Sequence, residues 1–419
     1  MSRSRMRQFG GSRAWARGVA ALLALAALAI TPPAAHAAAP DGAAKGRPGA
    51  KPYPHDRELR LNQIQSVGTH NSYKPGPEPG GLPPSLQENL PYPLDLVESS
   101  IDYRHRPMAE QAGRLQMRHM ELDVNADPKG GRYVNTPLLT EVGGPARLKD
   151  PAWRKPGMKV FHLPQIDQRT TCVRFTDCLR QLKKWSHRNP GHLPFTVFVE
   201  IKDTPLLGGL MPTPPQWKAS DYDALDAEIR SVFNDDQLIT PDDVQGNHPT
   251  LESAVLDNGW PTLAKSRGKF MFVNCNCLAN DRHRTDYLRP DGSLHDRVMF
   301  PTSKPGNPDA AVVLMEDPVK DRAKMQELVR AGYLIRTRTD ANTAEARSGD
   351  TTRRDAAFAS GAQIIDTDYP EPDPRINPTY GVRVPGGTAG RCNPVNAPRS
   401  CTALDVENPA HRHRGSYRP

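Results

Sequence analysis

The sequence predicts an α/β protein whose best description is a (β/α)8 TIM barrel with long Pro-rich loops that can distort it. Eight short β-rich runs alternate mostly with helical patterns, as expected for parallel strands joined by helices. About 310 residues lie between Leu61 and Pro370, which is enough for one such barrel. No Gly-rich phosphate-binding loop follows the first run, and this disfavours the alternative fold, a doubly wound sheet.

The expected strands are rich in β-branched and aromatic residues and are bounded by polar loops. In chain order they cover residues 63–67, 117–124, 158–163, 194–201, 270–274, 311–315, 333–337 and 363–367. Residues 297–300 compete with the sixth of these runs. The fourth run, "PFTVFVEI", is nearly continuous in apolar residues, as is typical of a parallel strand buried on both faces.

Helical patterns separate several of these runs. They cover residues 176–185, 222–233, 324–331 and 352–360, and a further helix is expected inside 251–264. In the first pattern, the apolar residues from Cys178 to Trp185 fall on one stripe. Gly332 and Gly361 follow the last two patterns, and a glycine at that place predicts the end of a helix.

The ends of the chain are expected to lie outside the barrel. Residues 1–37 predict a secretory signal peptide, with five Arg, an apolar stretch over residues 19–30 and an Ala-His-Ala cleavage site. Residues 38–57 are rich in Ala, Pro and Gly and predict a linker. The catalytic barrel is expected over 58–375 and a C-terminal extension over 376–419.

The charge balance excludes some partners. The chain has 55 basic and 47 acidic residues, a net charge of +8. The signal peptide holds five of the Arg and no acidic residue, so the mature chain of 419 − 37 = 382 residues carries about +3. This small excess gives no reason to expect nucleic-acid binding. The mature chain has no other apolar segment of 18 residues, so no transmembrane segment is expected.

The chain has six Cys, all after the signal peptide. In a secreted protein they are expected to form disulfides. Proximity in sequence favours Cys172 with Cys178 and Cys392 with Cys401, which leaves Cys275 for Cys277. A zinc site is the alternative, and it is disfavoured because the Cys do not form two CxxC pairs.

Polar residues gather at the ends of the first four expected strands, where the functional groups of such a barrel lie. They are His70 and Asn71 in "THNSY", Glu121 and Asp123 in "ELDV", His162 in "VFHLP", and Glu200 and Lys202 in "VFVEIKD". Alternate residues of a strand share a face, so Glu121 and Asp123 are expected to point the same way. A lone strand Glu is usually part of a salt bridge and a lone His usually bonds a loop, but the ordered set favours a functional site.

The residue types indicate the chemistry of this site. Three carboxylates and one carboxamide form an oxygen-donor set, which suits Ca²⁺ or Mg²⁺. The two His provide what an acid–base pair requires. A metal ion held beside them can neutralise a phosphate and lower the pKa of a bound hydroxyl.

The ordered set of motifs resembles the catalytic barrel of the calcium-dependent phosphatidylinositol-specific phospholipases C, in particular the secreted bacterial single-barrel type. The resemblance is carried by residues 64–202. It implies that Asn71, Glu121, Asp123 and Glu200 are Ca²⁺ ligands and that His70 and His162 are catalytic. It also implies an enzyme that acts on a phospholipid head group at a membrane surface and releases diacylglycerol and an inositol phosphate. With the signal peptide, the enzyme is expected to be secreted, and it is expected to be a monomer.

Two other functions remain open from the sequence. A glycerophosphodiester phosphodiesterase, or the related sphingomyelinase D, also uses a His and a Glu-x-Asp metal pair at the mouth of a barrel. That group usually has His-Arg-Gly on the first strand, whereas this chain has His70-Asn71-Ser72. A secreted barrel that binds surfaces without catalysis is the other alternative, and the presence of both His disfavours it.

The second half of the chain offers candidates for substrate binding. Besides Lys202, they are Arg336 and Arg338 in "IRTRTD" and Asp366, Asp368 and Tyr369 in "IIDTDY". Arg can bind phosphate oxygens through two parallel bonds, Asp can accept sugar hydroxyls, and a Tyr ring can stack on an inositol ring. The alternative is that Arg336 and Asp366 form a structural ion pair between neighbouring strands.

Overall fold

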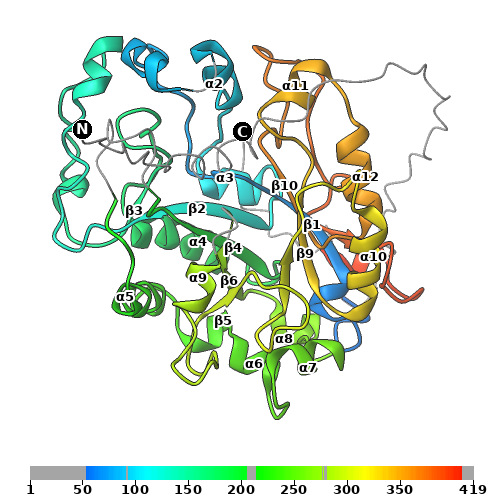
Figure 1. Ribbon diagram of the computed structural model, residues 1–419. Coiled ribbons are helices and arrows are strands. Elements are labelled where there is room, and N and C mark those ends of the chain that lie inside the picture. Colours follow the sequence, from blue (N-terminus) through cyan, green and yellow to red (C-terminus); the bar gives the residue numbers. More distant parts are fainter. Residues whose placement is uncertain (1–52, 91–92, 205–213, 276, 278–280, 408–419) are drawn as a thin grey trace, which may run out of the picture. The chain divides into compact units, whose positions relative to one another are not determined.

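The computed structural model describes residues 53–90, 93–204, 214–275, 277 and 281–407 (Figure 1). The expected signal peptide and most of the expected linker lie outside these ranges. Among the described residues, no helix combines the length and the apolar character needed to cross a bilayer.

A parallel sheet curls into a barrel, as the sequence predicts. Its strands, in spatial order, are β1 (Ile64–Thr69), β2 (His119–Asn125), β4 (Phe195–Ile201), β6 (Phe270–Cys275), β7 (Met299–Pro301), β8 (Val312–Leu314), β9 (Leu334–Arg338) and β10 (Ile364–Thr367). β10 pairs with β1, and a single parallel bridge between Thr302 and Val312 joins β7 to β8. The β7–β8 contact is therefore the weakest joint of the ring.

The third expected strand is not a strand of the barrel. The run at 158–163 forms only β3 (Lys159–Val160), which pairs antiparallel with the end of β2 and is not a barrel strand. Phe161, which follows it, packs against Tyr133 and Trp153 in a separate apolar cluster, so this run leaves the barrel. The barrel still has eight strands. The sequence offered residues 297–300 and 311–315 as alternatives for a single strand, and the structure has a strand in each, β7 and β8.

The helices confirm the expected pattern. They are α2 (Leu94–Ser100), α3 (Met108–Gly113), α4 (Phe175–Arg188), α5 (Ala219–Arg230), α6 (Pro241–Gln245), α7 (Leu251–Leu256), α8 (Leu263–Ser266), α9 (Arg282–Thr285), α10 (Arg322–Ala331), α11 (Ala344–Ser348), α12 (Thr352–Ser360) and α13 (Ala403–Val406). Short 3-10 helices cover Leu61–Gln63, Pro84–Asn89, Pro137–Val142, Pro151–Arg154 and Asp235–Gln237. Gly332 and Gly361 end α10 and α12 with φ of 115° and 78°, values that favour glycine.

The amino ends of the barrel strands are covered by the end of the described chain. β11 (Arg391–Cys392) pairs antiparallel with the start of β1. Arg118, just before β2, forms two hydrogen bonds of 3.0 and 2.6 Å with one carboxylate oxygen of Glu407. The same oxygen accepts a bond from the amide of Leu193, just before β4. The remaining short strand, β5 (Leu238–Ile239), pairs with the start of β6.

The three disulfides favoured by the sequence are all present. They join Cys172 to Cys178, Cys275 to Cys277 and Cys392 to Cys401.

Candidate active site

The end of β1 sends two adjacent side chains to one site. The amide of His70 still bonds Thr367 of β10 at 3.2 Å, so the strand pairing extends to this residue. Asn71 then takes a left-handed conformation with φ of 47°, which Asn tolerates better than most residues. Its carbonyl accepts a bond from the amide of Lys74 at 3.0 Å, which closes a tight turn. This turn buries Asn71 and leaves His70 18% exposed at the mouth of the barrel.

Three carboxylates converge at the same end of the barrel. Asp123 of β2 is the register partner of Glu200 of β4, so their side chains lie side by side. Glu121 lies two residues before Asp123 and shares its face. Ligand atoms of Glu121, Asp123 and Glu200 all lie within 4.8 Å of one another, and the three residues are buried. The structure thus brings together the carboxylates that the sequence selected.

Burial dominates the electrostatics of this cluster. It raises the pKa of Asp123 to about 6 and that of Glu121 well above its usual value. Burial also acts on Glu200, but the neighbouring Lys202 outweighs it and lowers the pKa of that carboxyl. His70 and His162 contribute to the same lowering, which places both imidazoles in the electrostatic neighbourhood of Glu200.

Lys202 lies inside the carboxylate cluster. Its Nζ is 2.6 Å from Glu200 Oε1 and 2.9 Å from Asp123 Oδ2. These two contacts hold its pKa above the usual value even though burial acts in the opposite direction. Substrate contact by Lys202 stays a prediction, and its position gives it a second role as counter-charge to two expected metal ligands.

The cluster fits a divalent cation. Glu121 Oε1 is buried and has no hydrogen-bond partner among the described residues. One end of the Asn71 amide lies 2.9 and 3.2 Å from the two carboxylate oxygens of Asp123. Without a cation, the amide nitrogen would face Asp123 and donate to its carboxylate. With a cation bound to both residues, the amide oxygen would face the same position and serve as a ligand. Two cations also lie against these carboxylates: Lys202 bonds Asp123 and Glu200, and Arg336 bonds the other oxygen of Glu121 at 2.6 Å. A divalent cation would therefore bind through oxygens that are already partly neutralised.

His70 is held between two carboxylates. Its Nδ1 is 2.8 Å from Asp368 Oδ1, and its Nε2 is 3.4 Å from Glu121 Oε1. Arg338 lies 2.9 Å from the other oxygen of Asp368 and so provides its counter-charge. Burial and, to a lesser extent, Arg338 lower the pKa of His70 well below its usual value.

His162 reaches the site from a loop. It follows β3 by two residues, and its Nδ1 is 2.8 Å from Asp167 Oδ2. Asp167 is fully buried and also bonds Lys74, which is itself fully buried.

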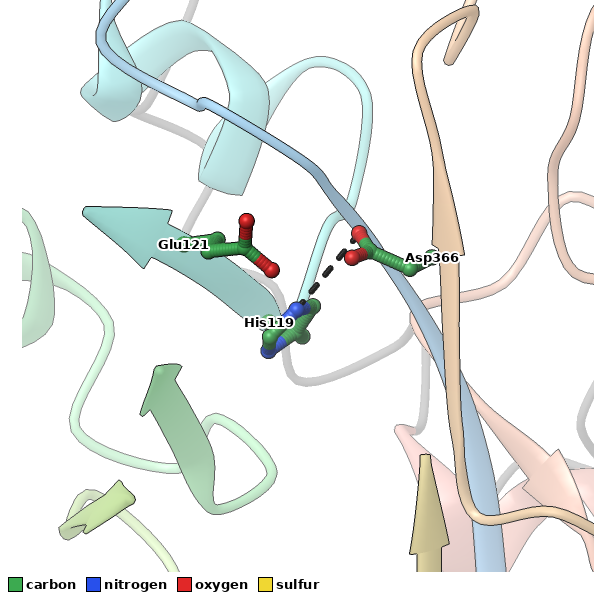
Figure 2. A group of neighbouring side chains, drawn as sticks. All are labelled: His119, Glu121 and Asp366. Atoms are coloured by element: carbon green, nitrogen blue, oxygen red, sulfur yellow. Dashed lines mark ion pairs between the residues drawn. The ribbon is translucent and has the colours of Figure 1, made fainter. Parts of the chain in front are cut away.

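Figure 2 shows a second convergence of side chains deeper in the barrel. His119 Nε2 lies 3.5 Å from Asp366 Oδ1, and Glu121 points toward both. The two meet across β1 because Gly68 is the register partner of both His119 and Asp366 and has no side chain. Arg336 binds the other oxygens of Asp366 and Glu121, the latter at 2.6 Å, so these two carboxylates already have a buried counter-charge.

The strand ends of β9 and β10 form ion pairs rather than an open surface. Arg336 bonds Asp366 and Glu316 as well as Glu121, which is the structural pairing that the sequence left as an alternative. Tyr369 is 3% exposed, and its hydroxyl donates to the carbonyl of Asp102 at 3.1 Å. Substrate contact by Arg336, Arg338, Asp366, Asp368 and Tyr369 stays a prediction.

Several residues of the site were not selected from the sequence. Asp167 is one, although its spacing of five residues from His162 in "HLPQID" was a usable signal. Lys74 closes the stretch "THNSYK" that carries His70. Tyr103 donates to or accepts from Asn71 at 2.7 Å, and nothing in the sequence pattern points to it.

The barrel and its cluster of oxygen donors define a parallel α/β-barrel protein with a candidate site for a divalent cation. Residues 59–394 match the model of a family described as phosphoinositide phospholipase C, Ca²⁺-dependent. Because this match covers most of the chain, the protein belongs to that family. It is therefore a phosphoric diester hydrolase that acts on phosphoinositides and uses Ca²⁺.

Solved structures give more distant likenesses. The Ca²⁺-dependent phosphatidylinositol-specific phospholipase C from Streptomyces antibioticus is 19% identical, with 77% of this chain and 98% of that chain covered and a TM-score of 0.44. The calcium-dependent phosphoinositol-specific phospholipase C from Pseudomonas sp. is 16% identical, with 81% and 97% covered and a TM-score of 0.45. Comparison with curated proteins gave no match.

Proposed function

We propose that this enzyme cleaves phosphatidylinositol-type phosphodiesters to diacylglycerol and an inositol phosphate, with Ca²⁺ held by Asn71, Glu121, Asp123 and Glu200. The observation that supports this most directly is the carboxylate cluster, in which oxygens of Glu121, Asp123 and Glu200 lie within 4.8 Å of one another, with Asn71 and His70 beside it. A Ca²⁺ ion held by these residues would supply charge neutralisation for the phosphate and would lower the pKa of a hydroxyl bound to it.

His70 and His162 share the proton transfers. In each ring Nδ1–H donates to a buried Asp, and we assign Nε2 to the substrate; in His70 this nitrogen lies 3.4 Å from Glu121 Oε1. One imidazole takes the proton of an inositol hydroxyl as that hydroxyl attacks phosphorus. The other gives a proton to the glycerol oxygen that leaves. A phosphodiester with such an internal hydroxyl, as in phosphatidylinositol, is the substrate that we propose.

The setting that we propose is extracellular. The sequence of residues 1–37 supports export, and the paired Cys support an oxidising compartment. The enzyme acts as a monomer on phospholipid head groups at a membrane surface.

Product analysis tests this function. Vesicles that contain phosphatidylinositol are incubated with the purified enzyme in Ca²⁺ or in excess chelator, and the products are identified by mass spectrometry. We expect diacylglycerol and an inositol phosphate in Ca²⁺ and neither product in chelator. Choline or free glycerol from other phosphodiesters would favour the glycerophosphodiesterase or sphingomyelinase D alternative. Vesicle binding without any cleavage would favour the non-catalytic barrel.

A further inference from the structure

The loop that carries His162 is built around one carboxylate. Leu163 and Asp167 exchange two backbone hydrogen bonds of 3.0 Å, which makes residues 163–167 a closed turn. Gln165, inside the turn, takes a left-handed conformation with φ of 62°. Gln168 ties the turn to the rest of the fold by donating to the carbonyl of Tyr133 at 2.8 Å. This turn returns the Asp167 side chain to the His162 ring five residues earlier.

The two side-chain partners of Asp167 favour its ionised form. Burial alone would raise its pKa, but Lys74 and His162 outweigh burial and lower it. Its Oδ2 takes both bonds, and its Oδ1 has no hydrogen-bond partner among the described residues. A carboxylate fixed in this way accepts a hydrogen bond from Nδ1–H of His162, and the neutral ring then keeps its lone pair on Nε2.

Lys74 connects this carboxylate to the expected metal site. It belongs to the turn that begins at Asn71, and its Nζ lies 4.7 Å from the ring centre of Tyr103. The Tyr103 hydroxyl is 2.7 Å from the Asn71 amide. One short turn therefore places both an expected Ca²⁺ ligand and the counter-charge of the carboxylate that binds His162.

From these contacts we infer that Asp167 is a positioning residue for the reaction. It fixes the orientation and the tautomer of His162, and Lys74 holds Asp167 in place as its counter-ion. The inference rests on the proposed catalytic role of His162. His162 needs such support because it lies on a loop, whereas the backbone of His70 is still bonded to a barrel strand. Both imidazoles then have the same support, with Nδ1 on a buried Asp that is paired with a cation.

A first test reads the tautomer directly. Nitrogen-15 NMR of the full-length wild-type protein is expected to show His162 protonated at Nδ1 when the ring is neutral. In Asp167→Asn the amide can donate to Nδ1, so the proton is expected to move to Nε2 in a large fraction of the molecules. Asp167→Glu keeps a carboxylate and is expected to retain the wild-type tautomer. An unchanged tautomer in Asp167→Asn would overturn the inference.

This test has a matched control and does not depend on activity. Asp226 is a buried Asp on α5 that bonds Tyr287 and Arg297, far along the chain from the site. Asp226→Asn should show the stability loss of a buried Asp→Asn change with no change at His162. If the wild-type protein does not cleave phosphatidylinositol, the proposed function fails, while the tautomer still decides the role of Asp167.

A second test separates positioning from general stability. Asp167→Asn is expected to lower kcat/KM about 100-fold, the low end of what acid–base catalysis contributes, mostly through kcat. In a His162→Ala background the same change is expected to have less than about a twofold effect, since Asp167 acts through the ring. An equal loss in both backgrounds would show that Asp167 only holds the loop together and would overturn the inference.

Discussion

At the scale of single residues, each buried charge of the site is paired with an opposite charge, which replaces the solvation that water would give it. Asp167 with Lys74, Asp368 with Arg338, and Glu200 with Lys202 are all buried or nearly so. A buried carboxylate without such a partner would be protonated or would destabilise the fold. The charges of the candidate site are therefore buried together with their counter-ions.

The expected metal ligands give the first prediction. Glu121→Gln or Asp123→Asn removes a charge from the cluster and should lower activity at least about 100-fold and weaken Ca²⁺ binding. Isothermal titration with Ca²⁺ and the vesicle assay measure the two effects. Asp177→Asn, on the exposed side of α4, is the control and should change neither. Full activity of Glu121→Gln in excess chelator would contradict the metal role.

Lys202 gives the second prediction. Because its ammonium is bonded to both Asp123 and Glu200, it competes with a cation for these oxygens. In Lys202→Met we expect Ca²⁺ to bind roughly tenfold more tightly, a change of about 1.4 kcal/mol. If Lys202 also binds substrate, KM rises in the same variant. Unchanged or weaker Ca²⁺ binding would show that the ammonium does not compete with the ion.

At the scale of elements, strands are held to one another by side chains as well as by backbone bonds. Arg336 of β9 reaches Asp366 of β10 and Glu121 of β2, which are not all neighbours in the sheet. Gly68 of β1 makes the deeper contact possible, because a Cβ there would lie 2.2 Å from the carbonyl oxygen of His119. Because Gly68 has no side chain, His119 of β2 and Asp366 of β10 can contact each other across β1.

The ion bridge predicts a stability effect. Arg336→Met leaves Asp366 and Glu121 buried without their shared cation, and this should lower the free energy of unfolding by roughly 3–5 kcal/mol. Arg338→Met, at a site 13% exposed with Asp368 as its one strong partner, should lower it less. Urea unfolding of both variants measures the difference. A normal unfolding curve for Arg336→Met together with a raised KM would instead indicate substrate binding.

At the scale of the whole molecule, the two ends of the barrel have different tasks. The carboxyl ends of the strands hold the candidate site, and the amino ends are closed by residues 389–407. A cluster that includes Leu59, Leu193 and Val406 and the pairing of Arg118 with Glu407 make this closure. Changes at the closed end should therefore alter stability and leave the chemistry intact.

Glu407→Ala tests this separation. The change leaves Arg118 buried without its carboxylate and should lower the free energy of unfolding by roughly 3 kcal/mol. Activity of the folded protein at 25 °C should stay within about twofold of the wild type, since the site is at the other end. Thermal melts and the vesicle assay measure the two quantities. A large loss of activity with an unchanged melt would show that the two ends are coupled.

His192, also at the closed end, predicts acid sensitivity. Burial and, next, Arg118 lower its pKa to about 4, while its ring bonds Ser186 and the carbonyl of Leu193. The unfolded chain takes up the proton near pH 6.5, so stability is present above that pH and falls as the pH drops toward 4. The loss can reach roughly 3 kcal/mol once the pH has fallen to the folded-state pKa of about 4, where the folded ring also takes up the proton.

Urea unfolding of wild type and His192→Gln at pH 7 and pH 5 measures this contribution. The variant lacks the titrating ring, so its stability should fall less between the two pH values. Glu407 and Arg267 also face this ring and are kept in both proteins. An identical fall in both proteins would assign the acid sensitivity to other groups.

The sequence by itself determined the fold class, seven of the eight expected strands and the choice of the metal and histidine candidates. These follow from local signals: alternation of apolar runs with helical patterns, glycine stops at Gly332 and Gly361, and polar residues at strand ends. The three disulfides followed from proximity along the chain. These signals can be detected in the sequence because each depends on only a few consecutive residues.

Only the tertiary structure decided what each of these residues touches. It removed β3 from the barrel, because the apolar residues after it pack in a different cluster, and it placed Lys202 between two carboxylates. It also placed Lys74 against Asp167, 93 positions away, and Asp167 against the ring of His162. Pairings between distant residues depend on the register of strands and the closure of loops, and no local pattern records those distances.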